Sequence, residues 1–256
     1  MNKGFVIMAQ NTESTDYVKC AEMLSDSIKR TMPDSNVTII TTDLLPYGDL
    51  APNSDWKLIN DWQVYEASPY EYTIKLEADM YIPRSIEYWW DILKHRDVVI
   101  STTIRDYKGN ISDSKFYRKF IVDNKLPDTY NAITYFRKSD LAKDFYNTVR
   151  NIFEDWEEVK TILKCNHNEP ATTDFVYALA CHVHGIENTT MPSFTDMSMI
   201  HVKQFINDLL TDDWTNELVY ELLPNTLRVN TFTQKYPFHY HVKHFASILE
   251  DTYGRS

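Results

Sequence analysis

Glycine is scarce in this chain, with only 5 among 256 residues. Phosphate-cradling loops and dinucleotide-binding turns need glycines at fixed spacing, because the backbone must approach the phosphates closely. The turn after the first apolar segment instead contains Gln10, Asn11 and Thr12. The sequence therefore excludes a Walker-type phosphate loop and a dinucleotide-binding fingerprint.

Basic residues, cysteines and long apolar runs are also few. The 26 Lys and Arg residues against 37 Asp and Glu give a formal net charge of −11, which argues against a general binder of phosphate backbones. Three widely spaced cysteines are typical of free thiols in a reducing compartment. The apolar run at the start of the chain is too short for a signal peptide or a bilayer-spanning helix. We therefore expect a cytoplasmic protein without a membrane span.

The order of apolar segments predicts an α/β fold. Apolar runs at 4–10 and 36–42 predict buried strands, and helical spacing of apolar residues over 16–31 predicts a helix between them. Such a β-α-β opening is typical of a parallel sheet. Further strands are expected at 72–81, 97–101 and 130–137, and further helices at 85–93, 139–159 and 173–184. We expect one domain over 1–256, with 204–256 as a C-terminal elaboration.

The segment Lys75-Leu76-Glu77-Ala78-Asp79 carries the strongest chemical signal. Side chains alternate along a strand, so Lys75, Glu77 and Asp79 should share one face. Burying three ionisable groups is costly unless they are paired or bind a ligand. Ligands of open α/β sheets bind beyond the carboxyl ends of the strands, where two carboxylates could hold a hard divalent cation. A structural ion pair between Lys75 and a carboxylate is the alternative.

Glu77-Ala78-Asp79 resembles the D-x-D motif of GT-A glycosyltransferases, especially glycogenin and bacterial lipopolysaccharide galactosyltransferases. The resemblance spans about residues 4–203. It includes the first strand with its turn, the stretch Tyr130-Asn131-Ala132-Ile133, the stretch from Pro170 to Asp174, and Met199-Ile200-His201-Val202-Lys203. The chain departs from the family in having Glu77 for the first Asp, Ile133 for a Gly, and no K-P-W after the histidine.

The resemblance implies a GT-A (Rossmann-like) mixed, mostly parallel sheet flanked by helices, and a transferase that uses a UDP-type nucleotide sugar with Mn²⁺ or Mg²⁺. It assigns the metal to Glu77, Asp79 and His201. It assigns catalytic roles to Asn131, Asp174 and Lys203, with Asn131 and Asp174 holding sugar hydroxyls and Lys203 facing the diphosphate. The residues expected to bind the donor are Ala9, Gln10, Asn11, Tyr17, Asp43, Lys75 and Lys243.

Several alternatives remain open at this point. His239 or His241, in the run Phe238-His239-Tyr240-His241-Val242-Lys243, could replace His201 as the third ligand. Asp174 could serve only as a favourable charge at a helix N-terminus, and residues 11–15 could serve only as a helix cap.

The function has alternatives as well. A non-catalytic sugar- or nucleotide-binding module would not need the intact Glu77/Asp79 pair. A sugar-phosphate nucleotidyltransferase would need a glycine-rich loop after its first strand. The acceptor could be a glycan, a protein, a small metabolite or a modified DNA base, and the acidic net charge counts against DNA unless Lys115, Arg118 and Lys119 form a basic face.

Overall fold

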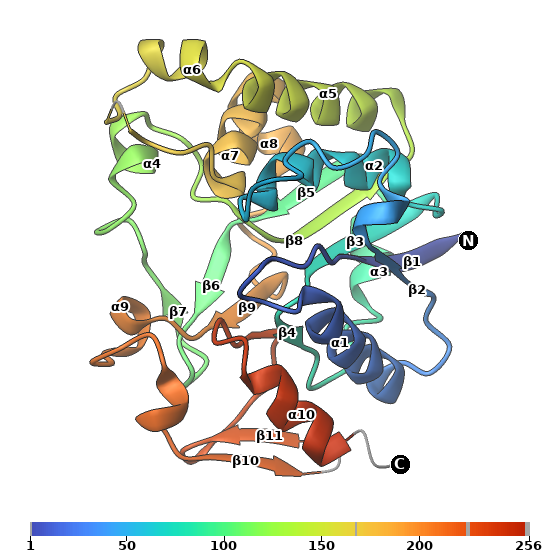
Figure 1. Cartoon of the computed structure of the whole chain (residues 1–256), viewed down its shortest axis with the longest axis vertical. Coiled ribbons are helices and arrows are strands. Elements are labelled where there is room, and N and C mark those ends of the chain that lie inside the picture. The colour runs from blue at the N-terminus through green and yellow to red at the C-terminus, as the bar shows by residue number, and fades with distance from the viewer. Residues whose placement is uncertain (1, 167, 224–225, 254–256) are drawn as a thin grey trace.

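The computed structural model describes residues 2–166, 168–223 and 226–253 (Figure 1). The first sheet has the strand order β2-β1-β3-β8-β5. Its strands are β1 (Lys3–Met8), β2 (Val37–Ile40), β3 (Tyr72–Glu77), β5 (Val98–Ser101) and β8 (Tyr130–Arg137). β1 pairs in parallel with β2 and β3, whereas β8 is antiparallel to both β3 and β5. Four strands therefore run one way and only β8 runs the other, which confirms the expected mixed, mostly parallel sheet.

Two further sheets complete the described strands. The second sheet has the order β4-β13-β9-β6-β7 and the third has the order β10-β11-β12. Their strands are β4 (Met80–Tyr81), β6 (Thr103–Arg105), β7 (Ile111–Ser112), β9 (Ser198–His201), β10 (Tyr220–Leu223), β11 (Thr226–Val229), β12 (Phe232–Thr233) and β13 (Phe238–His239). β13 lies between β4 and β9, so a segment near the C-terminus joins the strand that directly follows β3.

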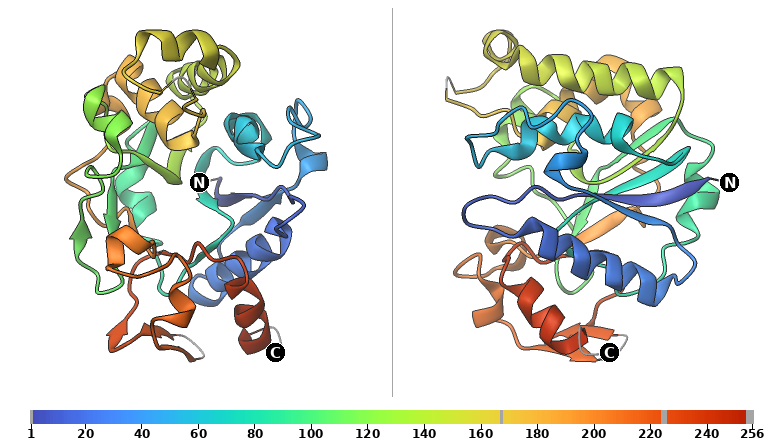
Figure 2. Two further views of the ribbon diagram at one scale, coloured as in Figure 1. Left: turned by 60° about the vertical axis from the view of Figure 1, so that its left-hand side comes forward. Right: turned by 45° about the vertical axis from the view of Figure 1, so that its right-hand side comes forward.

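Helices cover both faces of the first sheet. Figures 1 and 2 show α1 (Tyr17–Thr31) on one face and α5 (Asp140–Glu154) with α7 (Thr173–His184) on the other. Successive residues of β1 alternate accordingly. Phe5 and Ile7 pack into the core that contains α1, while Val6 packs into the core that contains α5 and α7.

The remaining helices are short. The α-helices are α2 (Val64–Ala67), α3 (Trp89–Leu93), α4 (Lys119–Asp123), α6 (Trp156–Val159), α8 (Ile186–Thr189), α9 (Gln204–Asn207) and α10 (Phe245–Tyr253). The 3₁₀ helices are η1 (Thr42–Leu44), η2 (Lys57–Gln63), η3 (Lys160–Ile162) and η4 (Trp214–Asn216). Among the described residues, no helix combines the length and apolarity needed to cross a bilayer. The three cysteines are free thiols, as expected.

Local signals placed the long helices well. Ser139 caps α5 by accepting a hydrogen bond from the backbone N–H of Ala142, and Gly185 ends α7 with a φ of 88°. Three expectations were wrong. The helix expected over 85–93 begins only at Trp89. The helix expected to run to residue 159 ends at Glu154, and the strand expected over 72–81 is split by a turn at Ala78 and Asp79. That turn lets β4 leave the first sheet and pair with β13.

Candidate functional site

A cavity of about 380 Å³ lies where β1 and β3 end. Its walls come from the turn after β1, the segment 55–61, the end of β3 and two segments from the last quarter of the chain. The lining residues are Met8, Gln10, Thr12, Tyr17, Asp55, Trp56, Lys57, Leu58, Asp61, Lys75, Glu77, Ala78, Asp79, Lys203, His239, His241 and Lys243. This is the edge of the sheet at which open α/β folds bind ligands.

The two predicted acids lie together at the end of β3. Glu77 is the last residue of the strand, and Asp79 occupies the turn that follows. The Asp79 carboxylate accepts a hydrogen bond from the Lys243 ammonium, and its Oδ2 lies 2.9 Å from Nε2 of His239. Burial would raise the pKa of Asp79, but His239 and Lys243 outweigh it and hold that pKa below its ordinary value. Burial raises the pKa of Glu77, and His239 and Lys75 oppose this effect.

The C-terminal segment brings two imidazoles and an ammonium to these acids. β13 ends at His239, and the chain then turns through His241, which has a left-handed φ of 60°. Ligand atoms of Asp79, His239 and His241 all lie within 4.8 Å of one another, so these three side chains could share one ion. Burial, followed by the charge of Lys203, lowers the pKa of His241 to about 4. His241 is therefore neutral at pH 7 and offers a lone pair to a metal.

His201, predicted as the third ligand, lies behind His239. Its Nδ1 lies 2.8 Å from Nδ1 of His239, and the two rings are stacked. Burial lowers the pKa of His201, so the ring is neutral. Depending on its tautomer, its Nδ1 either donates or accepts the hydrogen bond to His239. His201 is not among the described side chains that could share one ion with Asp79. Its position is that of a partner that orients the His239 ring.

Lys75 is held in an ion pair. Its side chain is 2% exposed, and its Nζ lies 2.7 Å from Oδ1 of Asp61 and donates a 3.2 Å hydrogen bond to the carbonyl of Asn131. The Asp61 carboxylate also accepts hydrogen bonds from Asn131 Nδ2 at 2.9 Å and from the Tyr177 hydroxyl at 2.7 Å. The ion pair between Lys75 and a carboxylate, which the sequence analysis gave as the alternative to ligand binding, is thus present in the molecule. Sequence analysis missed Asp61, although a buried lysine requires a counterion from elsewhere in the chain.

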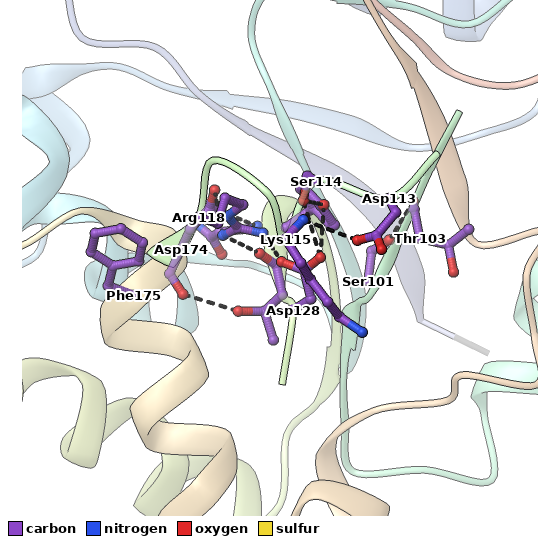
Figure 3. Close-up of polar contacts among 12 residues, drawn as sticks. Ser101, Thr103, Asp113, Ser114, Lys115, Arg118, Asp128, Asp174 and Phe175 are labelled. Atoms are coloured by element: carbon purple, nitrogen blue, oxygen red, sulfur yellow. Dashed lines mark hydrogen bonds and ion pairs between the residues drawn. The ribbon is translucent and has the colours of Figure 1, made fainter. Parts of the chain in front are cut away.

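Asn131 and Asp174, predicted to contact the sugar, lie together outside the cavity lining. Asn131 is fully buried, and its backbone N–H donates a 2.8 Å hydrogen bond to Asp174 Oδ1. The other oxygen of Asp174 lies 3.2 Å from the guanidinium of Arg118, which also pairs with Asp128 (Figure 3). Burial is the largest cause of the raised pKa of Glu77, and the negative charge of Asp174 raises it further by a smaller amount. Arg118 is therefore neutralised by two carboxylates and does not form part of a basic face.

The residues predicted to bind the donor differ in their placement. Gln10, Tyr17 and Lys243 line the cavity, and the ammonium of Lys243 lies 5.3 Å from the centre of the Tyr17 ring. Ala9 is buried in the core, and Asn11 accepts a hydrogen bond from the N–H of Val18, as the capping alternative proposed.

The second strand contributes differently from what was expected. Asp43 is exposed and does not line the cavity, and the wall beyond β2 comes instead from Asp55, Trp56, Lys57 and Leu58. Asp55 accepts a hydrogen bond from the backbone N–H of Glu13, which links this segment to the turn after β1. Trp56, a tryptophan in a polar segment, was the available sequence signal for a binding residue. Nothing local in the sequence indicated that it would line this cavity.

No protein-family model matches the sequence, and no curated protein matches it significantly. Solved structures of similar fold include the galactosyltransferase LgtC in complex with donor and acceptor sugar analogues, at 9% identity over 74% of this chain and 73% of that one, with a TM-score of 0.48. Apo mouse xyloside xylosyltransferase 1 is 11% identical over 75% of this chain and 84% of that one, with a TM-score of 0.44. A glycosyltransferase involved in glycosylation of the major capsid of PBCV-1 is 13% identical over 77% and 81%, with a TM-score of 0.38.

Proposed function

We propose that this chain is a metal-dependent glycosyltransferase that uses a UDP-type nucleotide sugar. The observation that carries the proposal is the convergence of two acids, two imidazoles and two ammonium groups on one cavity. These groups belong to Glu77, Asp79, His239, His241, Lys203 and Lys243. Acids and imidazoles together suit a divalent ion, and ammonium groups beside them suit the diphosphate that such an ion accompanies.

Three residues of the cavity lining, Gln10, Tyr17 and Trp56, suit a nucleoside. Nε2 of Gln10 is buried in the wall and has no hydrogen-bond partner among the described residues. A buried donor without a partner is costly, and a pyrimidine carbonyl would satisfy it. Tyr17 and the half-exposed Trp56 supply aromatic surface to the lining of the same cavity. This pairing of an amide with aromatic rings favours a uracil base.

The donor set fits a bound ion. One carboxylate from Asp79 and two imidazoles from His239 and His241 suit Mn²⁺ better than Mg²⁺, which prefers oxygen ligands. Glu77 Oε2, 3.6 Å from Nε2 of His239, adds a second carboxylate next to this set. A bound ion would offset negative charge on the leaving diphosphate.

The reaction itself would be a group transfer. The acceptor hydroxyl oxygen forms a bond to the anomeric carbon of the sugar, and the bond from that carbon to the diphosphate oxygen breaks. The diphosphate leaves with the electron pair, takes up the hydroxyl proton and departs as UDP. Lys203 and Lys243 would stabilise the negative charge that develops on the diphosphate. Asp174, held by Arg118, would orient sugar or acceptor hydroxyls.

Thermal shift with UDP, GDP, ADP and CMP, each with Mn²⁺, tests the nucleotide and the ion. A ligand at a hundredfold excess over its dissociation constant stabilises the folded state by about 2.7 kcal/mol, which corresponds to a rise in Tm of roughly 5–10 °C. UDP should give the largest shift, and EDTA should abolish it. Asp79→Asn should abolish both the Mn²⁺-dependent shift and the hydrolysis of UDP-sugars, because the amide lacks the ligand's negative charge.

Asp91→Asn provides the matched control, since Asp91 is 81% exposed at the start of α3 and does not line the cavity. It should behave as the wild type. A larger shift with GDP or ADP would refute the choice of UDP. A UDP shift without hydrolysis of any UDP-sugar would favour the non-catalytic binding module, and full activity in EDTA would remove the metal from the proposal.

A further inference from the structure

Three exposed aromatic side chains form a cluster outside the cavity, which we call the aromatic platform: Phe116, Tyr117 and Phe205. They are 61%, 36% and 63% exposed. The Phe116 and Tyr117 rings are 5.0 Å apart, and Phe205 lies 6.5 Å and 6.0 Å from them. Phe116 and Tyr117 precede α4, whereas Phe205 lies on α9, so tertiary folding brings them together. Contiguous exposed apolar surface of this kind marks a binding site in soluble proteins.

The aromatic platform is connected along the chain to two groups already placed at the site. Phe205 follows Lys203 by two residues, and Lys203 lines the donor cavity. Tyr117 precedes Arg118, whose guanidinium holds Asp174. The charge of Asp174 acts on both Tyr117 and Glu77 and helps to raise the pKa of each, although burial is the larger cause. The platform is therefore carried by segments that directly adjoin Lys203, which lines the donor cavity, and Arg118, which holds Asp174.

The charge around the aromatic platform argues against a polyanionic ligand. The segments that carry it, 113–128 and 203–213, contain five Lys and Arg residues and six Asp residues. Arg118 is buried and paired with Asp128 and Asp174, so it is not available to a phosphate. Binding of a nucleic acid backbone requires an excess of accessible cations. Aromatic faces beside carboxylates instead suit a neutral polyol, because the rings pack on the C–H face of a sugar and the carboxylates accept hydrogen bonds from its hydroxyls.

We propose that the aromatic platform binds the acceptor and that this acceptor is a neutral carbohydrate. The inference rests on the proposed transferase function and specifies its second substrate. A sugar ring packed on Phe116 and Phe205 would present a hydroxyl toward Asp174 and the donor cavity. A modified DNA base, the last of the four acceptor classes that the sequence left open, would require the basic face that Arg118 does not supply.

Saturation-transfer NMR with lactose, maltose and cellobiose at millimolar concentration tests the platform. At least one disaccharide should receive saturation from the aromatic protons of the wild type. Combined Phe116→Ala and Phe205→Ala substitution should weaken that binding about tenfold or more, while Phe205→Tyr should retain it. The Tm shift with UDP and Mn²⁺ should be the same in all these variants. Phe232→Ala is the matched control, because Phe232 is an exposed aromatic residue on β12, 38% exposed.

Three results would overturn the inference. The first is that none of the three disaccharides receives saturation, and the second is that Phe232→Ala weakens disaccharide binding as much as the combined substitution does. The third is that the wild type binds a single-stranded oligonucleotide and the two alanine substitutions abolish that binding. All three residues are exposed, so the substitutions should not unfold the chain; if the combined variant does unfold, Phe205→Ala alone gives the comparison. Failure of the proposed function looks different. A wild type that binds a disaccharide on the platform and shows no UDP shift would be a carbohydrate-binding protein without a donor, and the acceptor assignment would fall with it.

Discussion

Substitution of Lys75 by Met separates a structural role from a role in donor binding. The methionine keeps the length of the apolar stem and removes the ammonium. The Asp61 carboxylate, whose side chain is 9% exposed, would then keep only its neutral donors, Tyr177 and Asn131. An uncompensated buried charge is much more costly than a missing hydrogen bond.

The magnitude follows from this geometry. Removing one partner of a buried ion pair destabilises proteins by about 3–5 kcal/mol, a large part of a total stability of roughly 5–15 kcal/mol. For a chain of this length the expected fall in Tm is roughly 10 °C. Adding Asp61→Asn to Lys75→Met should recover most of the loss, because the amide oxygen can still accept hydrogen bonds while the unpaired charge is gone.

Urea denaturation of the wild type, both single variants and the double variant measures these free energies of unfolding. UDP affinity in the presence of Mn²⁺, measured on the folded fraction of each variant, supplies the second readout. We expect Lys75→Met to change stability far more than UDP affinity. A loss of stability below about 1 kcal/mol together with a tenfold or greater loss of UDP affinity would refute the structural role and return Lys75 to the donor site.

Two further predictions concern the ligands of the cavity. His239→Ala and His241→Ala should lower Mn²⁺ affinity by more than the 10- to 100-fold that is typical of residues that only orient a ligand, whereas His201→Ala should fall within that range. Isothermal calorimetry decides this, and an equal or larger effect of His201→Ala would place that residue among the ligands. Trp56→Ala should weaken UDP binding by roughly 1–3 kcal/mol and Trp56→Phe by much less, if the indole stacks on the base. Unchanged UDP affinity in Trp56→Ala would exclude stacking.

Much of the fold could be predicted because its signals are local. The helix over 173–184 was predicted with its observed bounds, since Gly185, the kind of residue expected just past a helix end, follows it directly. The strand over 130–137 was likewise predicted with its observed bounds. The split between β3 and β4 could not be predicted, because polar and apolar residues keep alternating from Lys75 to Met80 and only pairing with β13 separates the two strands.

The candidate site divides in the same way. The placement of Glu77 and Asp79 at the end of a central strand follows from alternation along β3 and from the general location of ligand sites in α/β sheets. The choice among the histidines does not follow from the sequence. His201 and His239 are both the last residue of a strand. Only the pairing of β13 with β4 decides that His239 is the one that contacts Asp79, at 2.9 Å.

By itself, the sequence determined the α/β class, the positions of the long helices and the acid pair, because these depend on contacts between residues close along the chain. The tertiary structure decided which groups surround that pair. His239 and Lys243, which contact Asp79, lie 160 and 164 residues from it in the sequence. The Tyr177 hydroxyl, which donates a hydrogen bond to the neighbouring carboxylate Asp61, lies 116 residues from that acid. Hydrophobic periodicity reports which face of an element is buried, but it does not report which other element is packed against that face.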